Sequence, residues 1–243
     1  MATQVDKREK PSKTLKVTDK NKIENSIIPT GSTGLVRVGN SIEITSKIIR
    51  EHEERIINKL FPTTKIGSQI WMTNNLDVDC YANGDQIPEV QNPIEWENLK
   101  TGAWCYYKNN PEDGKRLGKI YNWYALNDPR GLAPEGFKIA SIEDWKVLFD
   151  FLGENIAGYK LKSISGWKEN GNGSNEFEMN ILPAGYRMYN IFIGKDDYTH
   201  IWTSTEKNEN SAVFVNFNHY GDNVFSSDTF KYTGSYVRCL KLQ

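Results

Sequence analysis

From Thr63 to Gln243, apolar residues occur in short aromatic and β-branched segments rather than at helical spacing, and this pattern constrains the fold most strongly. Clusters of Gly, Asn and Asp separate the segments, as is typical of strands joined by turns and long loops. The clearest segments are Gln69–Trp71, Ala103–Tyr107, Ile201–Ser204, Ala212–Phe217 and Tyr236–Leu240. Two other segments have the spacing of short helices, Tyr121–Leu126 and Ser141–Leu152, the second capped by Ser141 and ended by Gly153. We therefore predict an α+β fold for residues 63–243.

A longer helix is predicted before Pro62, in residues 35–62. Apolar and seam positions there are spaced by three and four residues in alternation, which is the heptad spacing of a coiled coil. They are Leu35, Val38, Ile42, Thr45, Ile49, His52 and Ile56. Asn40 and Glu43 form a capping-box pattern that predicts a helix start near Ser41, and Pro62 ends it. A helix over 41–60 is too short to be securely stable alone in water, so we expect it to dock on its own domain, self-associate or join a larger assembly.

Residues 1–34 are predicted to be a disordered basic tail and linker. Seven of the first 22 residues are basic, three are acidic and none is aromatic, and the segment Pro29–Gly34 is typical of turn or coil. Over the whole chain, 30 Lys and Arg balance 31 Asp and Glu. The net charge of −1 does not favour a nucleic acid as the partner.

The sequence also limits location and covalent chemistry. No apolar stretch approaches the roughly 20 residues of a membrane span, and the first residues lack the apolar core of a signal peptide. We therefore expect a cytoplasmic protein, or one exported as part of an assembled particle. Three cysteines, Cys80, Cys105 and Cys239, are too few and too scattered for a disulfide scaffold or a four-ligand zinc site. Pairing of Cys80 with Cys105 stays open.

Large aromatic residues are the expected core of the predicted domain. The chain has 7 Trp, 12 Tyr and 10 Phe but only 38% hydrophobic residues, so rings with polar edges must replace aliphatic layers. The predicted core rings are Trp71, Trp123, Phe137, Trp145 and Trp202. Arg187 and Arg238 lie near aromatic residues, and we expect both guanidinium groups to be stacked or paired inside the fold.

Six sequence blocks, in order, resemble the Fibrobacter succinogenes major paralogous domain, a C-type-lectin-like family common in Bacteroidetes. The blocks are Ile66–Leu76, Gly118–Ala125, Ala133–Trp145, Leu182–Arg187, Ile201–Glu206 and Gly234–Cys239. The resemblance covers residues 64–243 and nothing before Thr63. It implies a C-type-lectin-like fold of two small twisted antiparallel sheets, two helices and long loops.

The sequence gives no sign of an enzyme or a cofactor. The formylglycine-generating enzymes share this general fold class and use a reactive cysteine pair, and Cys80 and Cys105 do not match that pair. Sugar-binding C-type lectins usually carry Glu-Pro-Asn or Gln-Pro-Asp on a loop and Trp-Asn-Asp on a strand, and none of these occurs here. We predict no metal site, although a structural calcium ion in a loop stays open.

A ligand-binding face is the remaining prediction. Residues 216–232 are dense in Asn, Tyr, Ser, Asp and Phe, a composition typical of adaptable binding surfaces. The candidate ligand-binding residues are Tyr198, His200, Asn218, Tyr220, Asn223, Phe225 and Tyr232. We expect a non-enzymatic module that recognises a protein or a surface ligand and is tethered by residues 35–60 to a phage or contractile injection particle. The alternatives are a soluble cargo or effector loaded through its N-terminal segment and, less favoured, a cysteine-dependent oxidase.

Overall fold

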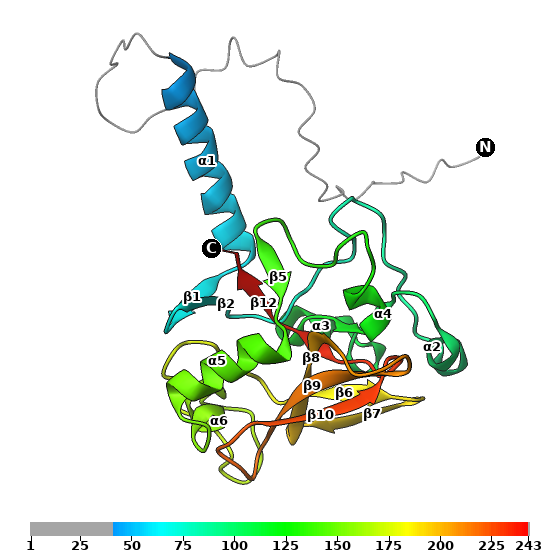
Figure 1. The fold of residues 1–243 in the computed structure, drawn as a ribbon. Helices are drawn as coiled ribbons and strands as arrows, with labels where there is room; N and C mark the ends of the chain where they lie inside the picture. Colours follow the sequence, from blue (N-terminus) through cyan, green and yellow to red (C-terminus); the bar gives the residue numbers. More distant parts are fainter. Residues whose placement is uncertain (1–40, 243) are drawn as a thin grey trace, which may run out of the picture. The chain divides into compact units, whose positions relative to one another are not determined.

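The computed structural model describes residues 41–242, with side chains from Ile48 onward (Figure 1). The predicted tail and linker over 1–34 lie outside the described residues, as do residues 35–40 of the predicted helical segment. The chain divides into two compact units after Ile49, and every described strand belongs to the second unit, residues 50–243.

Helices and strands mix along the described chain without a regular alternation, so the predicted α+β class is confirmed. The helices are α1 (Ser41–Leu60), α2 (Pro93–Asn98), the 3₁₀ helix η1 (Tyr107–Asn109), α3 (Pro111–Leu117), α4 (Trp123–Leu126), α5 (Ile142–Leu152) and α6 (Ala157–Leu161). The strands are β1 (Thr63–Ile66), β2 (Gln69–Met72), β3 (Trp104–Cys105), β4 (Ile120–Tyr121), β5 (Phe137–Ile139), β6 (Ala184–Met188), β7 (Ile191–Lys195), β8 (Tyr198–Glu206), β9 (Ser211–Asn218), β10 (Phe225–Phe230), β11 (Tyr236–Val237) and β12 (Cys239–Lys241).

The three helices predicted from the sequence are present. Helix α1 covers residues 41–60, and α4 lies inside the segment predicted as a short helix. Helix α5 begins with a capping box in which the Ser141 hydroxyl accepts from the Asp144 N–H and the Asp144 carboxylate accepts from the Ser141 N–H. It ends at Gly153, whose φ of +89° favours glycine.

The expectation of two helices in the domain is too low, because α2, α3 and α6 are also present. Asn92 caps α2 and Asn110 caps α3, and in both helices proline occupies the first turn, where its missing N–H costs nothing. An Asn-Pro pair was therefore a usable start signal. Helix α6 has no side-chain cap, and the sequence offered no comparable signal for it.

Two larger sheets contain most of the strands, and β3 and β4 form a third, two-stranded sheet, so the expectation of two sheets is too low. A four-stranded sheet has the order β1-β2-β12-β5 with antiparallel pairs. A six-stranded sheet has the order β10-β9-β8-β6-β7, and β11 also pairs with β8. Strands β6 and β11 run parallel to β8, so the expectation of purely antiparallel sheets is wrong for this sheet. Long connections allow these parallel pairs, because β8 and β11 are adjacent in space but not in sequence.

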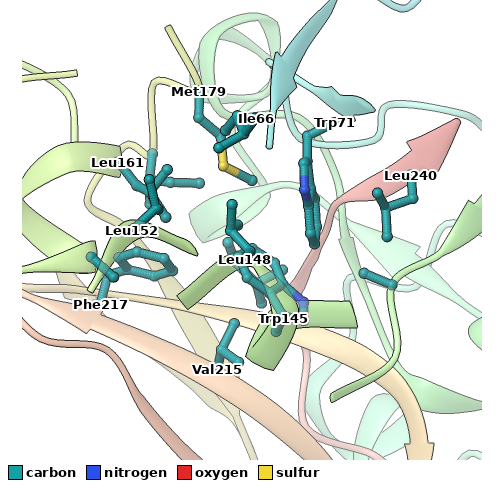
Figure 2. Packing of buried hydrophobic residues seen from close by; sticks show 14 of the residues in the cluster. Ile66, Trp71, Trp145, Leu148, Leu152, Leu161, Met179, Val215, Phe217 and Leu240 are labelled. Carbon is teal, nitrogen blue, oxygen red and sulfur yellow. The ribbon is translucent and has the colours of Figure 1, made fainter. Parts of the chain in front are cut away.

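The main core is formed by α5 together with residues of both larger sheets, Ile66, Trp71 and Leu240 from the four-stranded sheet and Val215 and Phe217 from the six-stranded sheet (Figure 2). Trp145 of α5 contacts Trp71 of β2 at a ring distance of 4.5 Å, and Phe217 of β9 at 6.2 Å. All five predicted core rings are buried, Trp71, Trp123, Phe137, Trp145 and Trp202. Each fully buried ring contributes roughly 1.5–3 kcal/mol of transfer free energy, so this aromatic set replaces an aliphatic core.

Arg187 and Arg238 are buried, and their guanidinium groups donate hydrogen bonds to main-chain carbonyl oxygens of distant loops. This agrees with the prediction that both groups are stacked or paired inside the fold. Arg187 donates to the Val90 and Gln91 carbonyls and stacks over the Trp96 ring at 4.3 Å.

Arg238 donates to the Met72, Met179 and Asn180 carbonyls and to the Asn75 side chain. Burial lowers the pKa of Arg238 to about 9. Each guanidinium therefore joins chain segments that are far apart in sequence.

Candidate functional site

Six of the seven predicted ligand-binding residues gather at one end of the six-stranded sheet. Tyr198 begins β8 and pairs with Asn218 at the end of β9, and Phe225 begins β10 opposite Asn216. His200 lies two residues along β8 from Tyr198, and the turn from β9 to β10 carries Tyr220 and Asn223. We call these six residues the candidate face: Tyr198, His200, Asn218, Tyr220, Asn223 and Phe225.

Tyr232 does not join the candidate face. It follows the far end of β10, and its ring stacks on Phe230 at 5.2 Å and lies 5.4 Å from the Tyr189 ring. A six-residue strand places Phe225 and Phe230 about 17 Å apart, so Tyr232 belongs to a separate aromatic group.

His200 and Asn218 lie in the interior. His200 is 8% exposed and Asn218 is fully buried, so these two side chains support the surface from below. The His200 ring stacks on Tyr186 of β6 at 3.7 Å and on Phe214 of β9 at 4.2 Å, which joins three neighbouring strands. Burial lowers the pKa of His200 to about 3, so its imidazole is neutral at pH 7.

A buried lysine fixes the turn that carries the candidate face. The Lys162 ammonium donates to the Asn218 carbonyl at 3.1 Å and to the Gly221 carbonyl at 2.9 Å, from a side chain that is 1% exposed. It also lies 5.3 Å from the Trp167 ring centre. Burial lowers the pKa of Lys162, and the negative charge of Asp222 partly opposes that shift. The ammonium binds this turn from within the domain, so the turn is held without help from a ligand.

Backbone contacts hold the same turn from two further sides. Tyr159 of α6 donates its N–H to the Asp222 carbonyl, and His219 donates its N–H to the Asp197 carbonyl. Gly171 packs so closely that a Cβ atom there would lie 2.2 Å from the His219 carbonyl oxygen. The turn is therefore preorganised, which lowers the entropy cost of binding a partner.

Polar atoms without a protein partner are concentrated at this end of the sheet. They are Thr199 Oγ1, His200 Nδ1, Asn216 Oδ1, both amide atoms of Asn218, and His219 Nδ1. These atoms are buried, and buried polar groups are nearly always hydrogen-bonded, so such a cluster is suited to internal water molecules beneath the surface. His219 Nδ1 lies 3.6 Å from Asp197 Oδ1, beyond hydrogen-bond distance.

Exposed aromatic rings lie beside these polar atoms. Tyr220 is 67% exposed and Phe225 is 48% exposed, and the Tyr198 ring lies 6.1 Å from the Tyr220 ring. Desolvation and the neighbouring Tyr220 raise the pKa of Tyr198. Tyr198 therefore stays neutral and offers its hydroxyl group as well as its ring face at neutral pH.

The three cysteines are free thiols, so the open question of pairing between Cys80 and Cys105 is answered in the negative. Burial raises the pKa of Cys105 to about 11 and that of Cys239 to about 12, and it also raises the pKa of Cys80. A raised pKa disfavours the thiolate, which is the nucleophilic form of cysteine.

The described residues also bear on metal binding and on membrane insertion. Among the side chains described, from Ile48 to Leu242, no group of three or more His, Cys, Asp or Glu could hold a metal ion. Within 41–242, none of the helices combines the length and apolar character that crossing a membrane requires.

Sequence reasoning missed three contributors to this site, Tyr186, Asn216 and Lys162. Asn216 opens the Asn- and Tyr-rich stretch and pairs with His200, so alternation along β9 could have identified it. Tyr186 and Lys162 come from segments distant in sequence. Only the packing of β6 and of the segment after α6 brings them here.

One comparison with known proteins identifies a relationship. The family model described as Fibrobacter succinogenes major domain (Fib_succ_major) matches residues 64–241. No curated protein and no solved structure matches the chain.

Proposed function

Since the chain belongs to the Fibrobacter succinogenes major domain family over residues 64–241, we propose that it is a non-enzymatic recognition module that binds its ligand through the candidate face. The ligand is a protein or a surface component. The observation that carries this proposal is the coincidence, at one end of the sheet, of exposed rings, unpartnered polar atoms and a turn fixed by Lys162.

We further propose a C-type-lectin-like fold for residues 63–243. The two larger sheets, the packing of helix α5 with residues of both and the long loops support it. The long loops are held by Arg187, Arg238 and Lys162, which donate to main-chain carbonyl oxygens. A rigid scaffold carrying fixed loops is an arrangement that proteins often use for binding.

The unpaired thiols with raised pKa values support a binding function and do not favour a cysteine-dependent oxidase. Cys105 is buried and its pKa is raised to about 11, and the three thiols are unpaired. Reactive cysteines instead have a lowered pKa in an electropositive, partly exposed setting.

We propose that α1 attaches the module to a larger assembly, such as a phage or contractile injection particle. Ile48, Ile49 and Leu60 of α1 are 52%, 41% and 54% exposed, whereas Ile57 packs against the domain core. Ile49 and the half-buried Ile56 are seven residues apart, and this heptad spacing favours a helical partner. The alternative is a cargo protein that uses the same segment for loading.

The binding proposal is tested by selection against the full-length protein, using a random-peptide phage library and a glycan array. Selected binders should bind the double variant Tyr220→Ala, Phe225→Ala at least about tenfold more weakly, because central aromatic contacts carry much of an interface's free energy. Ile94→Ala is the matched control, since Ile94 is 73% exposed on α2, outside the candidate face. Binders that do not distinguish the double variant from wild type would contradict the assignment.

The attachment proposal is tested by light scattering on the full-length chain. If α1 self-associates, the variant Ile49→Ser, Ile56→Ser should lower the measured mass toward 27.9 kDa. An unchanged monomeric mass in both proteins would favour a heterologous partner and the cargo alternative.

A further inference from the structure

The two outer strands of the six-stranded sheet differ in how their free edges are protected. On β7, Gly194 has a φ of +74° that interrupts the extended backbone, and Lys195 is an edge lysine paired with Asp113. On β10 the pairing with β9 runs without a shift from Phe225 to Phe230, and the strand has no proline, lysine or bulge. Natural proteins usually protect an exposed edge by such features, because an open edge can pair with another strand.

The backbone groups that face outward on β10 can be assigned from the hydrogen bonds of β9. The Ser211 carbonyl accepts hydrogen bonds from the backbone N–H groups of Lys207 and Asn208, which lie in the connection between β8 and β9. The backbone groups of Ser211 therefore point toward β8, and they do not bond to Phe230, the residue opposite Ser211 on β10. The Phe230 carbonyl accordingly accepts from Thr233 instead. Alternation along an antiparallel pair then directs the backbone N–H and C=O of Ser226 and Asp228 outward, away from β9.

We propose that the outer edge of β10 pairs with β10 of a second copy of this chain, antiparallel across a two-fold axis at Ser227. This register places Ser226 opposite Asp228 of the second copy, and the reverse, so the outward groups of both residues exchange about four hydrogen bonds.

Charge disfavours one neighbouring register. Asp228 is the one charged residue of β10. A two-fold axis at Asp228 would place the two carboxylates directly opposite each other, which is destabilising, whereas an axis at Ser227 places each carboxylate opposite a serine hydroxyl. The strand is thus complementary to itself in its backbone groups and in its side chains.

Pairing in this way has a consequence for binding. A two-fold axis perpendicular to a continuous sheet leaves the same sheet face of both copies on one side. Because β10 and its copy run antiparallel, the strand ends that carry the two candidate faces point in opposite directions, so the dimer would present one candidate face at each end and link two ligands.

The test uses the full-length chain with Ile49→Ser and Ile56→Ser, so that association through α1 does not contribute. Sedimentation equilibrium from low micromolar to millimolar concentration should show a mass that rises from 27.9 kDa toward twice that value. Adding Ser226→Pro removes one outward N–H while leaving the bonds to β9 in place, and should raise the dimer dissociation constant at least about tenfold. Ser226→Ala, which keeps the N–H, is the matched control and should still associate.

Amide exchange on the chain without the proline gives an independent readout that does not depend on how well the proline variant folds. The N–H groups of Ser226 and Asp228 should exchange more slowly at high protein concentration than at low concentration. A mass that stays at 27.9 kDa at every concentration would overturn the proposal. So would equal association of the folded Pro and Ala variants, or exchange rates independent of concentration.

Discussion

His200 makes the stability of the domain depend on pH in a way that can be calculated. Its ring is 8% exposed between Tyr186 and Phe214, and its Nδ1 has no hydrogen-bond partner. A protonated imidazole in this position would be a buried charge without a counter-ion. The perturbation that tests this is His200→Phe, which keeps an aromatic ring in the stack but cannot be protonated.

The magnitude follows from the two pKa values of His200. The pKa is about 3 in the folded protein, against 6.5 for the free side chain. Between these values the unfolded state binds a proton that the folded state does not, so stability is fully present above pH 6.5 and falls as the pH falls toward 3. From pH 8 to pH 5 the free energy of unfolding falls by about 2 kcal/mol, and this loss depends almost entirely on the pKa of His200 in the unfolded chain.

The assay is urea unfolding of wild type and His200→Phe at pH 8 and pH 5. Wild type should lose about 2 kcal/mol more than the variant between the two pH values, or about 4–8 °C in Tm. His52→Gln removes an exposed histidine of α1 and is the matched control, expected to retain the wild-type loss. Equal losses in wild type and His200→Phe would refute the reasoning, since they would mean that native His200 accepts a proton without cost.

Three further predictions concern other parts of the domain. Lys162→Met should destabilise the protein by about 2–4 kcal/mol and speed amide exchange in the turn after β9, because two carbonyls lose their donor. Gly171→Ala should cost about 1–3 kcal/mol or more in unfolding experiments, because its Cβ would lie 2.2 Å from a carbonyl oxygen. Cys105 and Cys239, both buried with raised pKa values, should react with a thiol reagent only after unfolding, and half-buried Cys80 first. Fast labelling of all three thiols in the native protein would contradict the last prediction.

The sequence predicted those helices and strands that depend on residues close together in the chain. The capping box at Ser141 and the glycine after Leu152 set both ends of α5, and the alternating aromatic segments became β8 and β9. Helix α6 and the parallel pairing of β11 with β8 depend on contacts between distant segments, so no short stretch of the sequence could predict them.

The candidate site was likewise predicted where its residues are close in sequence and missed where they are distant. Six of the predicted residues come together because β8, β9 and the following turn are consecutive in the chain. Tyr232 separates from them because the full length of β10 intervenes, and the burial of Asn218 follows from packing that composition cannot reveal. Lys162 had no recognisable motif, since its partners are two backbone carbonyls about 60 residues away.

The way Lys162 holds the turn after β9 also determines which substitutions that turn can accept. The ammonium binds carbonyl oxygens of Asn218 and Gly221, and Tyr159 binds that of Asp222, so the anchoring uses a group that every amino acid carries. The side chain of Tyr220 takes no part in it and is 67% exposed. Mutations at that position can therefore change the surface that the turn presents while its backbone path is inherited unaltered, so this surface can evolve separately from the fold.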